Sequence, residues 1–222
     1  MDTGMSTGIV ILGAGGFARE AYWHLLAAQP GARVAFVDDT TDVQAIALGG
    51  KTVPVIKNWI FSGIRDADGP VDYTEFIVGV GAPKAKHILV ERALSSGLAP
   101  APTAVHPRAL IQDPECIIGR GGVITPGCVI TTNVRIGDYV ILNLNCTVGH
   151  DAVLGNYVTA NPGVSISGNV YLGENVSLGT GTVVREKVRI APNVVTGAQA
   201  CVVKDIDQPG VVVAGVPAKP LA

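Results

Sequence analysis

The sequence predicts a Rossmann-like α/β half-domain followed by a parallel β-helix built from six-residue repeats. The first observation is a six-residue period that runs from residue 104 to residue 205. The second is a shift in composition, because all four Phe and both Trp residues lie before residue 104. The third is an alternation of strand-like and helix-like segments before that point. We therefore expect two domains, 1–103 and 104–222.

The first half reads as strands alternating with helices. Short apolar runs predict strands at 8–12, 33–37 and 76–80. Apolar residues at helical spacing predict a helix from Phe17, closed by Pro30 and Gly31, and a second helix is expected over 84–95. This alternation indicates a parallel sheet. About 100 residues provide one mononucleotide-binding half of a doubly wound fold, but not two.

The second half repeats every six residues. Cut from Ala104, it divides into 17 hexads without an insertion. From Cys116 on, the third position is Ile, Leu or Val in 13 of 15 hexads, with Ala160 and Thr196 as the exceptions. Two inward residues in each hexad predict a short strand, and Gly, Asn, Pro or Asp in its other half predicts a turn. Such repeats must stack to bury their apolar face.

Three hexads per coil would place residues 18 apart above one another. The columns that result are uniformly apolar, which supports this period. Two of them are Ile118, Ile136, Leu154, Leu172, Ile190 and Ile130, Val148, Ile166, Val184, Val202. Of the four cysteines, the first three fall on inward positions and none forms a CxxC pair, so we expect buried thiols rather than a redox or zinc site.

The composition excludes several classes of protein. The net charge is −2 and Lys and Arg do not cluster, so we expect neither nucleic acid nor an anionic membrane as partner. No apolar run approaches the roughly 18 residues that span a bilayer. The initial segment MDTGMSTG lacks the basic and apolar parts of a signal peptide. A cytoplasmic protein is expected. The sequence contains no cluster of His with carboxylates at ligand spacing, so we expect no metal site.

His150 and Asp151 form the most suggestive polar pair. His150 is the fifth residue of its hexad, a turn position that faces outward, and Asp151 follows it. A neutral imidazole suits removal of a proton from an amine or hydroxyl nucleophile, and the carboxylate can orient the ring. Gly168 comes 18 residues later and therefore lies one coil on, where its N–H could stabilise an oxyanion.

A second candidate site lies in the first half. The glycines of the loop Gly13-Ala14-Gly15-Gly16 join a strand to a helix N-terminus, where N–H groups and the helix dipole favour phosphate. A dinucleotide reading would use Asp38 or Asp39, which follow the second strand, to bind a ribose. A tight turn that binds no ligand is the alternative for this loop.

The chain resembles the hexapeptide-repeat acyltransferases, whose prism is a left-handed β-helix. The segments ILGAGGFARE, FVDD, GHDAVLG and AGVPAKP resemble one subfamily, the sialic-acid O-acetyltransferases and sugar-nucleotide N-acetyltransferases of bacterial surface-glycan synthesis, including capsule and lipopolysaccharide. The resemblance covers essentially the whole chain. It implies an acetyl-CoA-dependent N-acetyltransferase acting on a nucleotide-linked amino sugar, and a homotrimer.

The resemblance also implies roles for particular residues. His150 would be the general base and Gly168 an oxyanion donor, while Asn143 would shape the acceptor site. The glycine loop and the two aspartates would hold the nucleotide of the sugar substrate, with Asp38 and Asp39 near the base. Coenzyme A would lie along the later coils between neighbouring prisms. The positions implied for the donor are Thr180, Ala198 and Lys219.

Two departures from the family pattern leave the sugar open. The polar segment that often follows the third strand is replaced by Gly81-Ala82-Pro83, and Thr159 stands where many relatives have His. The sequence does not select among UDP, dTDP, GDP and CMP, nor between N-acetylation and O-acetylation of a sialic or related sugar. A hexapeptide-repeat carbonic anhydrase is disfavoured because the repeats contain only His106 and His150. An inert binding module would have no use for the His-Asp pair.

Overall fold

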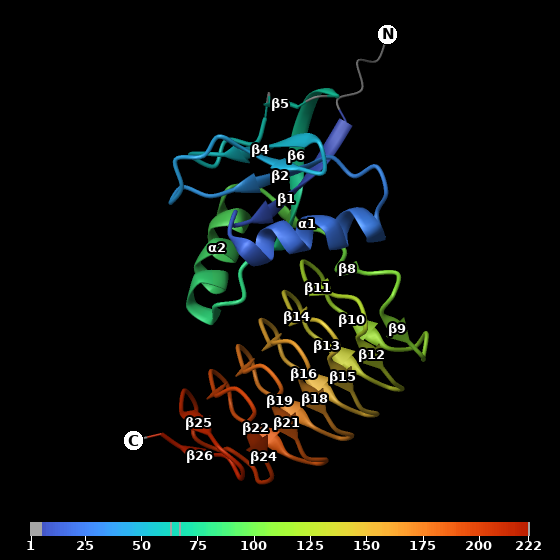
Figure 1. The fold of residues 1–222 in the computed structure, drawn as a ribbon, viewed down its shortest axis with the longest axis vertical. Coiled ribbons are helices and arrows are strands. Elements are labelled where there is room, and N and C mark those ends of the chain that lie inside the picture. The colour runs from blue at the N-terminus through green and yellow to red at the C-terminus, as the bar shows by residue number, and fades with distance from the viewer. Residues whose placement is uncertain (1–5, 63, 67, 222) are drawn as a thin grey trace.

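The computed structural model describes residues 6–62, 64–66 and 68–221. An α/β unit lies at one end of a β-helical prism, and the chain winds along the prism toward its C-terminus (Figure 1). The predicted fold class is confirmed. The segment MDTGMSTG, on which the signal-peptide prediction depends, lies largely outside the described residues. Within the described ranges, no helix is long and apolar enough to cross a membrane.

The α/β unit is a twisted sheet with two helices, α1 (Gly16–Ala28) and α2 (Pro83–Ser95). The pairs among β4, β2, β1, β6 and β7 are parallel, whereas β3 and β5 are antiparallel edge strands. The strands are β1 (Ser6–Leu12), β2 (Val34–Val37), β3 (Ala45–Leu48), β4 (Lys51–Ile56), β5 (Ile64–Asp66), β6 (Gly69–Val78) and β7 (Ala99–Pro100). The parallel strands β1, β2 and β6 match the prediction, but β3, β4, β5 and β7 were not predicted.

The prism has three faces, each formed by a sheet of parallel strands, and only the last pair of sheet 1 is antiparallel. Sheet 1 contains β8 (Ala104–Val105), β11 (Val123–Ile124), β14 (Ile141–Leu142), β17 (Thr159–Ala160), β20 (Ser177–Leu178), β23 (Val195–Thr196), β25 (Val212–Ala214) and β26 (Lys219–Pro220). Sheet 2 contains β9 (Leu110–Ile111), β12 (Val129–Ile130), β15 (Thr147–Val148), β18 (Ser165–Ile166), β21 (Val183–Val184) and β24 (Cys201–Val202). Sheet 3 contains β10 (Ile117–Ile118), β13 (Arg135–Ile136), β16 (Val153–Leu154), β19 (Tyr171–Leu172) and β22 (Arg189–Ile190).

The predicted 18-residue register holds from Ile117 to Val202, but the first coil corrects it. Ala104 pairs with Val123 and Leu110 with Val129, so these partners are 19 residues apart. The segment between β9 and β10 therefore contains one extra residue, and the expectation of 17 hexads without an insertion is wrong there. Asp113 holds this longer turn, because its carboxylate accepts hydrogen bonds from the backbone N–H groups of residues 115 and 133.

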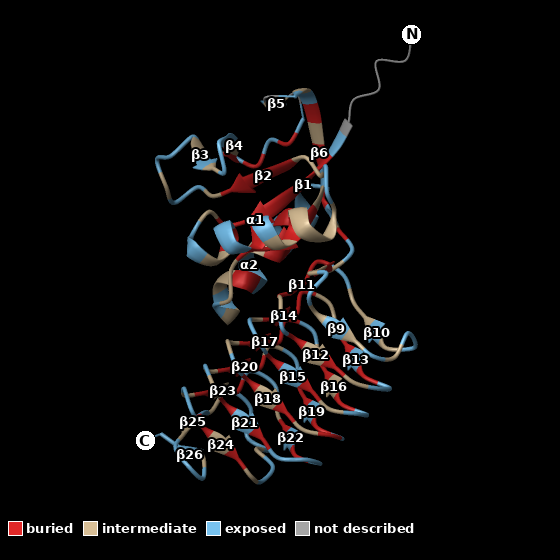
Figure 2. Cartoon of the chain, turned by 45° about the vertical axis from the view of Figure 1, so that its right-hand side comes forward, coloured by how far each residue is buried: buried red, intermediate tan, exposed pale blue. Residues whose placement is uncertain are grey.

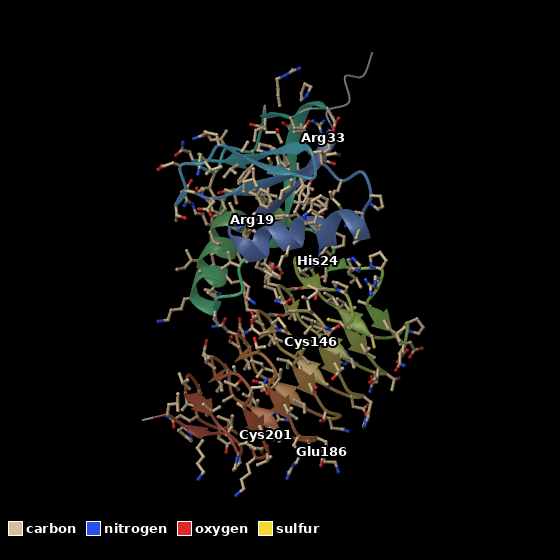
Figure 3. The ribbon with its side chains drawn as sticks, in the orientation of Figure 1. Arg19, His24, Arg33, Cys146, Glu186 and Cys201 are labelled. Carbon is tan, nitrogen blue, oxygen red and sulfur yellow. The ribbon has the colours of Figure 1, made fainter. Side chains whose placement is uncertain are left out.

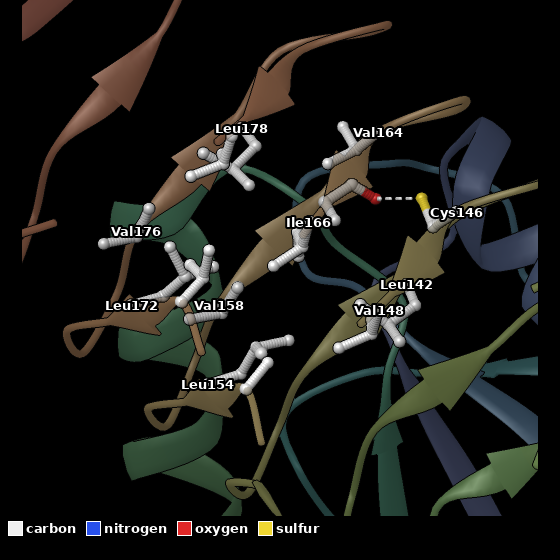
Figure 4. Packing of buried hydrophobic residues seen from close by; sticks show 14 of the residues in the cluster. Leu142, Cys146, Val148, Leu154, Val158, Val164, Ile166, Leu172, Val176 and Leu178 are labelled. Atoms are coloured by element: carbon white, nitrogen blue, oxygen red, sulfur yellow. Dashed lines mark hydrogen bonds between the residues drawn. The ribbon is translucent and has the colours of Figure 1, made fainter. Parts of the chain in front are cut away.

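The inward side chains form one continuous core. The third-position side chains of the hexads fill the prism, and Figure 2 shows buried residues recurring along its strands. Leu154 lies next to Leu172 in the column that the period predicted (Figure 4). Cys128 and Cys146 are fully buried free thiols, whereas Cys116 is only half-buried. The sixth position of every hexad from residue 121 to residue 199 adopts a left-handed φ between 53° and 80°. Gly and Asn are frequent there because they tolerate this conformation best.

The turns that join two neighbouring sheets form the three ridges of the prism, and each ridge is named after one of its residues. The Asn143 ridge joins sheet 1 to sheet 2, the His150 ridge joins sheet 2 to sheet 3, and the Tyr157 ridge joins sheet 3 back to sheet 1. The α/β unit packs on sheet 1 and on the Tyr157 ridge. Helix α1 contacts β8 and β11, and Phe76 stacks on Tyr139, which in turn contacts Tyr157.

A buried lysine lies in this contact. Lys86 of α2 is 1% exposed, and its ammonium donates to Thr159 Oγ1 at 2.6 Å and to the carbonyl of Val158 at 3.3 Å. Thr159 in turn donates to the carbonyl of Gly81 at 3.1 Å. Burial lowers the pKa of Lys86 to about 7, because the charged ammonium loses its contact with water.

Candidate active site

His150 is presented to solvent by the turn that follows β15. Its imidazole is 59% exposed, and Nδ1 lies 2.8 Å from Asp151 Oδ2. The other carboxylate oxygen of Asp151 accepts a hydrogen bond of 2.7 Å from Asn133, one coil earlier. The bonds from His150 and Asn133 lower the pKa of Asp151, which keeps the carboxylate charged. With Nδ1 as donor to Asp151, Nε2 is left with its lone pair available to accept a proton.

Gly168 lies directly beneath the reactive edge of this ring. A Cβ atom at residue 168 would lie 2.4 Å from His150 Nε2, so any side chain there would collide with the imidazole. The next residue fixes the two coils together, because the N–H of Asn169 donates to the carbonyl of His150 at 2.7 Å. Among the hydrogen bonds of the described residues, none uses the N–H of Gly168. The structure thus brings His150, Asp151 and Gly168 together.

The predicted acceptor and donor residues of the prism lie on another ridge. Asn143 occupies the turn after β14, where its side-chain oxygen accepts the N–H of Leu144 at 2.8 Å. Thr180 and Ala198 occupy the corresponding turns of later coils. All three therefore belong to the Asn143 ridge, and the whole width of sheet 2 separates them from His150 within one chain. The structure does not bring these residues into contact with the base.

Lys219 lies at the C-terminal end of the prism. It belongs to β26, which closes sheet 1 through an antiparallel pair with β25. Lys219 and Lys204 both line a cavity of about 410 Å³ whose walls include Val202 and Pro217. Lys204 comes 54 residues after His150, which is three coils along the same ridge. Asp205 and Asp207 line the same cavity, so a partly apolar cavity of mixed charge lies further along the prism from the His-Asp pair.

The glycine loop lies at the open end of the α/β sheet. Glycine is required at residue 13, because φ is +98° and a Cβ would lie 2.7 Å from Val80. Gly15 and Gly16 are different: a Cβ at either position would meet no atom within 4 Å. No side chain caps the N-terminus of α1. Packing within the chain does not require glycine at residues 15 and 16, and the space above them is open to a ligand.

Asp38 ties the glycine loop to the end of β2. Its Oδ2 accepts the N–H of Ala14 at 3.0 Å, and its Oδ1 accepts both the N–H and the hydroxyl of Thr40 at 2.8 and 2.6 Å. Burial alone would raise the pKa of Asp38, but these hydrogen bonds outweigh it and hold the pKa below its usual range. Asp38 shapes the loop in addition to any contact with a ligand.

Asp39 is held just as closely. It accepts the N–H of Asn58 at 3.0 Å and the indole N–H of Trp59 at 2.9 Å, and it pairs with Arg92 at 2.8 Å. Burial would raise the pKa of Asp39, but these donors lower it overall. Trp59 and Arg92 could not be identified from the sequence, because a Trp in a turn and an Arg in the last turn of a helix are ordinary features.

Two cavities border this loop. One, of about 580 Å³, is lined by Gly15, Asp38 and Arg19, a further cation that the sequence analysis did not single out. The other, of about 340 Å³, is lined by Gly13, Asp39 and α2. Figure 3 shows Arg19 on α1 and Glu186 at the far edge of the prism, where Glu186 occupies the His150 ridge one coil beyond Gly168. The glycine-loop cavities and the His150 ridge therefore lie in different parts of one chain.

The hexapeptide prism, the α/β unit with its open glycine loop and the exposed His-Asp pair define the class of this protein, a hexapeptide-repeat acyltransferase. Residues 8–93 match the family described as the PglD N-terminal domain. The acetyltransferase domain of PglB from Neisseria gonorrhoeae FA1090 is 32% identical over 96% of this chain and 99% of its own, with a TM-score of 0.83. The chain therefore belongs to the PglD-type hexapeptide acetyltransferases.

Two further solved structures are similar over nearly their whole length. A variant of perosamine N-acetyltransferase from Caulobacter crescentus, in complex with CoA and GDP-perosamine, is 29% identical over 97% of each chain, with a TM-score of 0.80. WeeI from Acinetobacter baumannii AYE is 28% identical over 97% of this chain and 100% of its own, with a TM-score of 0.83. Comparison with the curated proteins gives no match.

Proposed function

We propose that this acetyltransferase transfers the acetyl group of acetyl-CoA to the amino group of a nucleotide-linked sugar. One structure of the similar Neisseria domain contains acetyl-CoA, and the similar Caulobacter enzyme is a perosamine N-acetyltransferase. The observation that carries the proposal is the arrangement of His150 Nε2 above Gly168, with Asp151 holding the opposite nitrogen. This arrangement suits general-base catalysis of acyl transfer.

The chemistry follows from this geometry. His150 Nε2 takes a proton from the sugar amine as the nitrogen attacks the thioester carbonyl. The oxygen of the tetrahedral intermediate gains negative charge, and the N–H of Gly168 donates to it. The carbon–sulfur bond then breaks, and the protonated imidazole returns its proton to the departing coenzyme A sulfur. A hydroxyl nucleophile would use the same base, so an O-acetyltransferase acting on a sialic or related sugar remains the second candidate.

The placement of the residues supports a homotrimer. The α/β unit covers the earlier strands of sheet 1, and sheet 3 carries Arg135 and Arg189 on its outer surface. The outer positions of sheet 2 carry no charge, and they are Leu110, Val129, Thr147, Ser165, Val183 and Cys201. Sheet 2 is therefore the face best suited to pack against another prism. Such packing would bring the His150 ridge of one chain toward the Asn143 ridge or the α/β unit of another.

The donor would lie in the groove between two prisms. Thr180 and Ala198 would border its acyl arm from the Asn143 ridge. Lys204 and Lys219 would meet its phosphates at the C-terminal cavity, since both cations line that space. The glycine loop, Arg19, Asp38 and Asp39 would hold the nucleotide of the acceptor. A role in bacterial surface-glycan synthesis and a cytoplasmic location stay predictions.

The test is acetyl transfer from acetyl-CoA to UDP-, dTDP-, GDP- and CMP-linked amino sugars, each matched with its hydroxyl analogue. Mass spectrometry with mild alkali treatment distinguishes an amide from an ester. We expect acetylation of at least one amino sugar and of none of the hydroxyl analogues. Acetylation of hydroxyl groups alone would favour the O-acetyltransferase, and no transfer to any acceptor would contradict both candidates.

A further inference from the structure

The cavity of about 340 Å³ beside the glycine loop extends from the phosphate-accepting end of α1 toward α2. Its walls combine the loop residue Gly13, the carboxylate of Asp39 and the apolar side chains of Trp59, Ile88 and Leu89. It therefore lies where the nucleoside part of a ligand would sit if its phosphates met the N-terminus of α1. This inference rests on the proposed function, because it concerns the nucleotide of the proposed acceptor.

Arg92 is held rigidly at the wall of this cavity. Its guanidinium carbon lies 4.5 Å from the centre of the Trp59 ring, and its Nη1 lies 2.8 Å from Asp39 Oδ2. Trp59 is only 9% exposed and is fixed by an edge contact with Phe61. The Arg92 side chain is 50% exposed. A planar group with several N–H donors is thus presented to the cavity in a fixed orientation.

Asp39 has limited capacity to accept further hydrogen bonds. A carboxylate offers about four lone-pair sites. The N–H of Asn58 and the donors of Trp59 and Arg92 occupy three of them. One site remains for a ligand. Asp39 can therefore accept one N–H from a nucleobase, but it cannot satisfy two adjacent donors.

We propose that Arg92 and Asp39 together select a uracil or thymine base. The edge of these bases presents one N–H between two carbonyl groups. Asp39 would accept the N–H, and Arg92 would donate to a neighbouring carbonyl. Guanine presents two adjacent donors on the same edge, of which Asp39 could accept only one. Cytosine in the position of uracil would place its unprotonated N3 against Asp39, where a donor is needed. The nucleotide of the substrate would then be a uridine or thymidine diphosphate.

The test is calorimetric binding of UDP, dTDP, GDP and CDP to the full chain, without coenzyme A. We expect UDP and dTDP to bind about tenfold or more tightly than GDP and CDP, because an unmatched polar group in the cavity weakens binding. Arg92→Lys keeps the charge but loses the planar fork, and should weaken UDP binding about tenfold while leaving GDP binding unchanged. Arg189→Lys is the matched control, since Arg189 stacks on Tyr171 at 4.3 Å on sheet 3.

GDP binding as tight as UDP binding would overturn the inference, as would an Arg92→Lys chain with normal UDP affinity. Failure of all four nucleotides to bind would also overturn it. The proposed function fails separately. If UDP binding is selective and depends on Arg92 but no acetyl group is transferred, the nucleobase site stands and the enzymatic proposal does not. Efficient acetylation of a GDP-linked amino sugar would support the proposed function and overturn the selection of a uracil or thymine base.

Discussion

Backbone conformation and packing within the chain explain some residues of the candidate site but not others. Gly13 is required by backbone conformation and by packing against Val80, whereas Gly15 and Gly16 have neither reason. Gly168 is required by the imidazole above it. The sequence predicted His150, Asp151 and Gly168 as neighbours because the 18-residue period places them there. It could not show that Asp38 and Asp39 already hold several donors of their own chain, since most of these partners are distant in sequence.

The glycine loop allows a matched comparison. Gly15→Ala and Gly16→Ala should leave the melting temperature within a few degrees of wild type, because a Cβ there meets no atom. They should weaken binding of a nucleoside diphosphate about tenfold, because the methyl group occupies the space of the phosphate. Gly13→Ala is the control, and should lose about 1–3 kcal/mol of stability through strain and collision. Normal nucleotide affinity in both Gly15→Ala and Gly16→Ala would show that the phosphate does not bind at this loop.

Gly168→Ala tests the neighbour of the base. The added methyl group would lie within 2.4 Å of Nε2 and must displace the exposed ring. We expect kcat to fall about 100-fold or more with little change in melting temperature, because a displaced general base loses its contribution. Steady-state kinetics with thermal melting checks this result. Glu186→Ala, at the same hexad position one coil further, should keep near-normal kcat. Equal effects of the two substitutions would argue against a special role for Gly168.

At the scale of elements, periodicity predicted most of the prism and only part of the α/β unit. The strands from β10 to β24 follow the sequence period because each buries the same two positions. The first coil departs from it because the turn held by Asp113 contains an extra residue. Strands β3, β4 and β5 were missed because β4 contains Pro54 and the edge strands are short and half-exposed. Their pairing depends on long-range contacts that no local pattern shows.

The contact between α2 and sheet 1 should depend on pH through Lys86. The pKa of Lys86 is about 7 in the folded protein and near 10.5 in the unfolded chain. Between these values the unfolded chain binds the proton that the folded protein has released, so stability rises as pH increases from about 7 to about 10.5. Below about 7 the full cost of burial is present, on the order of 5 kcal/mol.

Lys86→Met should therefore raise the melting temperature at pH 7, and the difference from wild type should shrink toward pH 10.5. Both partners of the lysine keep other hydrogen bonds, since Thr159 donates to Gly81 and the carbonyl of Val158 accepts from Ile141. Thermal melting across this pH range provides the measurement. Lys84→Met, at an exposed position of the same helix, is the control and should show no such trend. A constant difference between Lys86→Met and wild type across pH would mean that Lys86 is charged when buried.

The whole molecule distributes its candidate site residues over three surfaces. The nucleotide cavities lie on the α/β unit, the base lies on the His150 ridge, and Asn143 with the donor residues lies on a second ridge. No single chain brings these surfaces together. We expect light scattering to give about three times the 22.8 kDa of one chain. Val129→Arg, on the uncharged face of sheet 2, should yield the single-chain mass and abolish acetyl transfer, because a buried unpaired charge opposes association.

Val153→Arg provides the control for this prediction. Val153 has the equivalent outward position on sheet 3, which already carries Arg135 and Arg189. This variant should keep the mass and the activity of the wild type. A fully active single chain, or loss of association in Val153→Arg alone, would show that the catalytic groups meet in another way.

The most direct test of the proposed mechanism is the turnover of His150→Ala with its best acceptor. The substitution removes the proton acceptor from an exposed turn and leaves the prism, the glycine loop and both cavities intact. We expect kcat to fall about 10²–10⁴-fold, while binding of acetyl-CoA and of the acceptor, measured by calorimetry, stays within about threefold of wild type. A His150→Ala enzyme with near-normal kcat would contradict this mechanism, because the nucleophile would then be activated by another group.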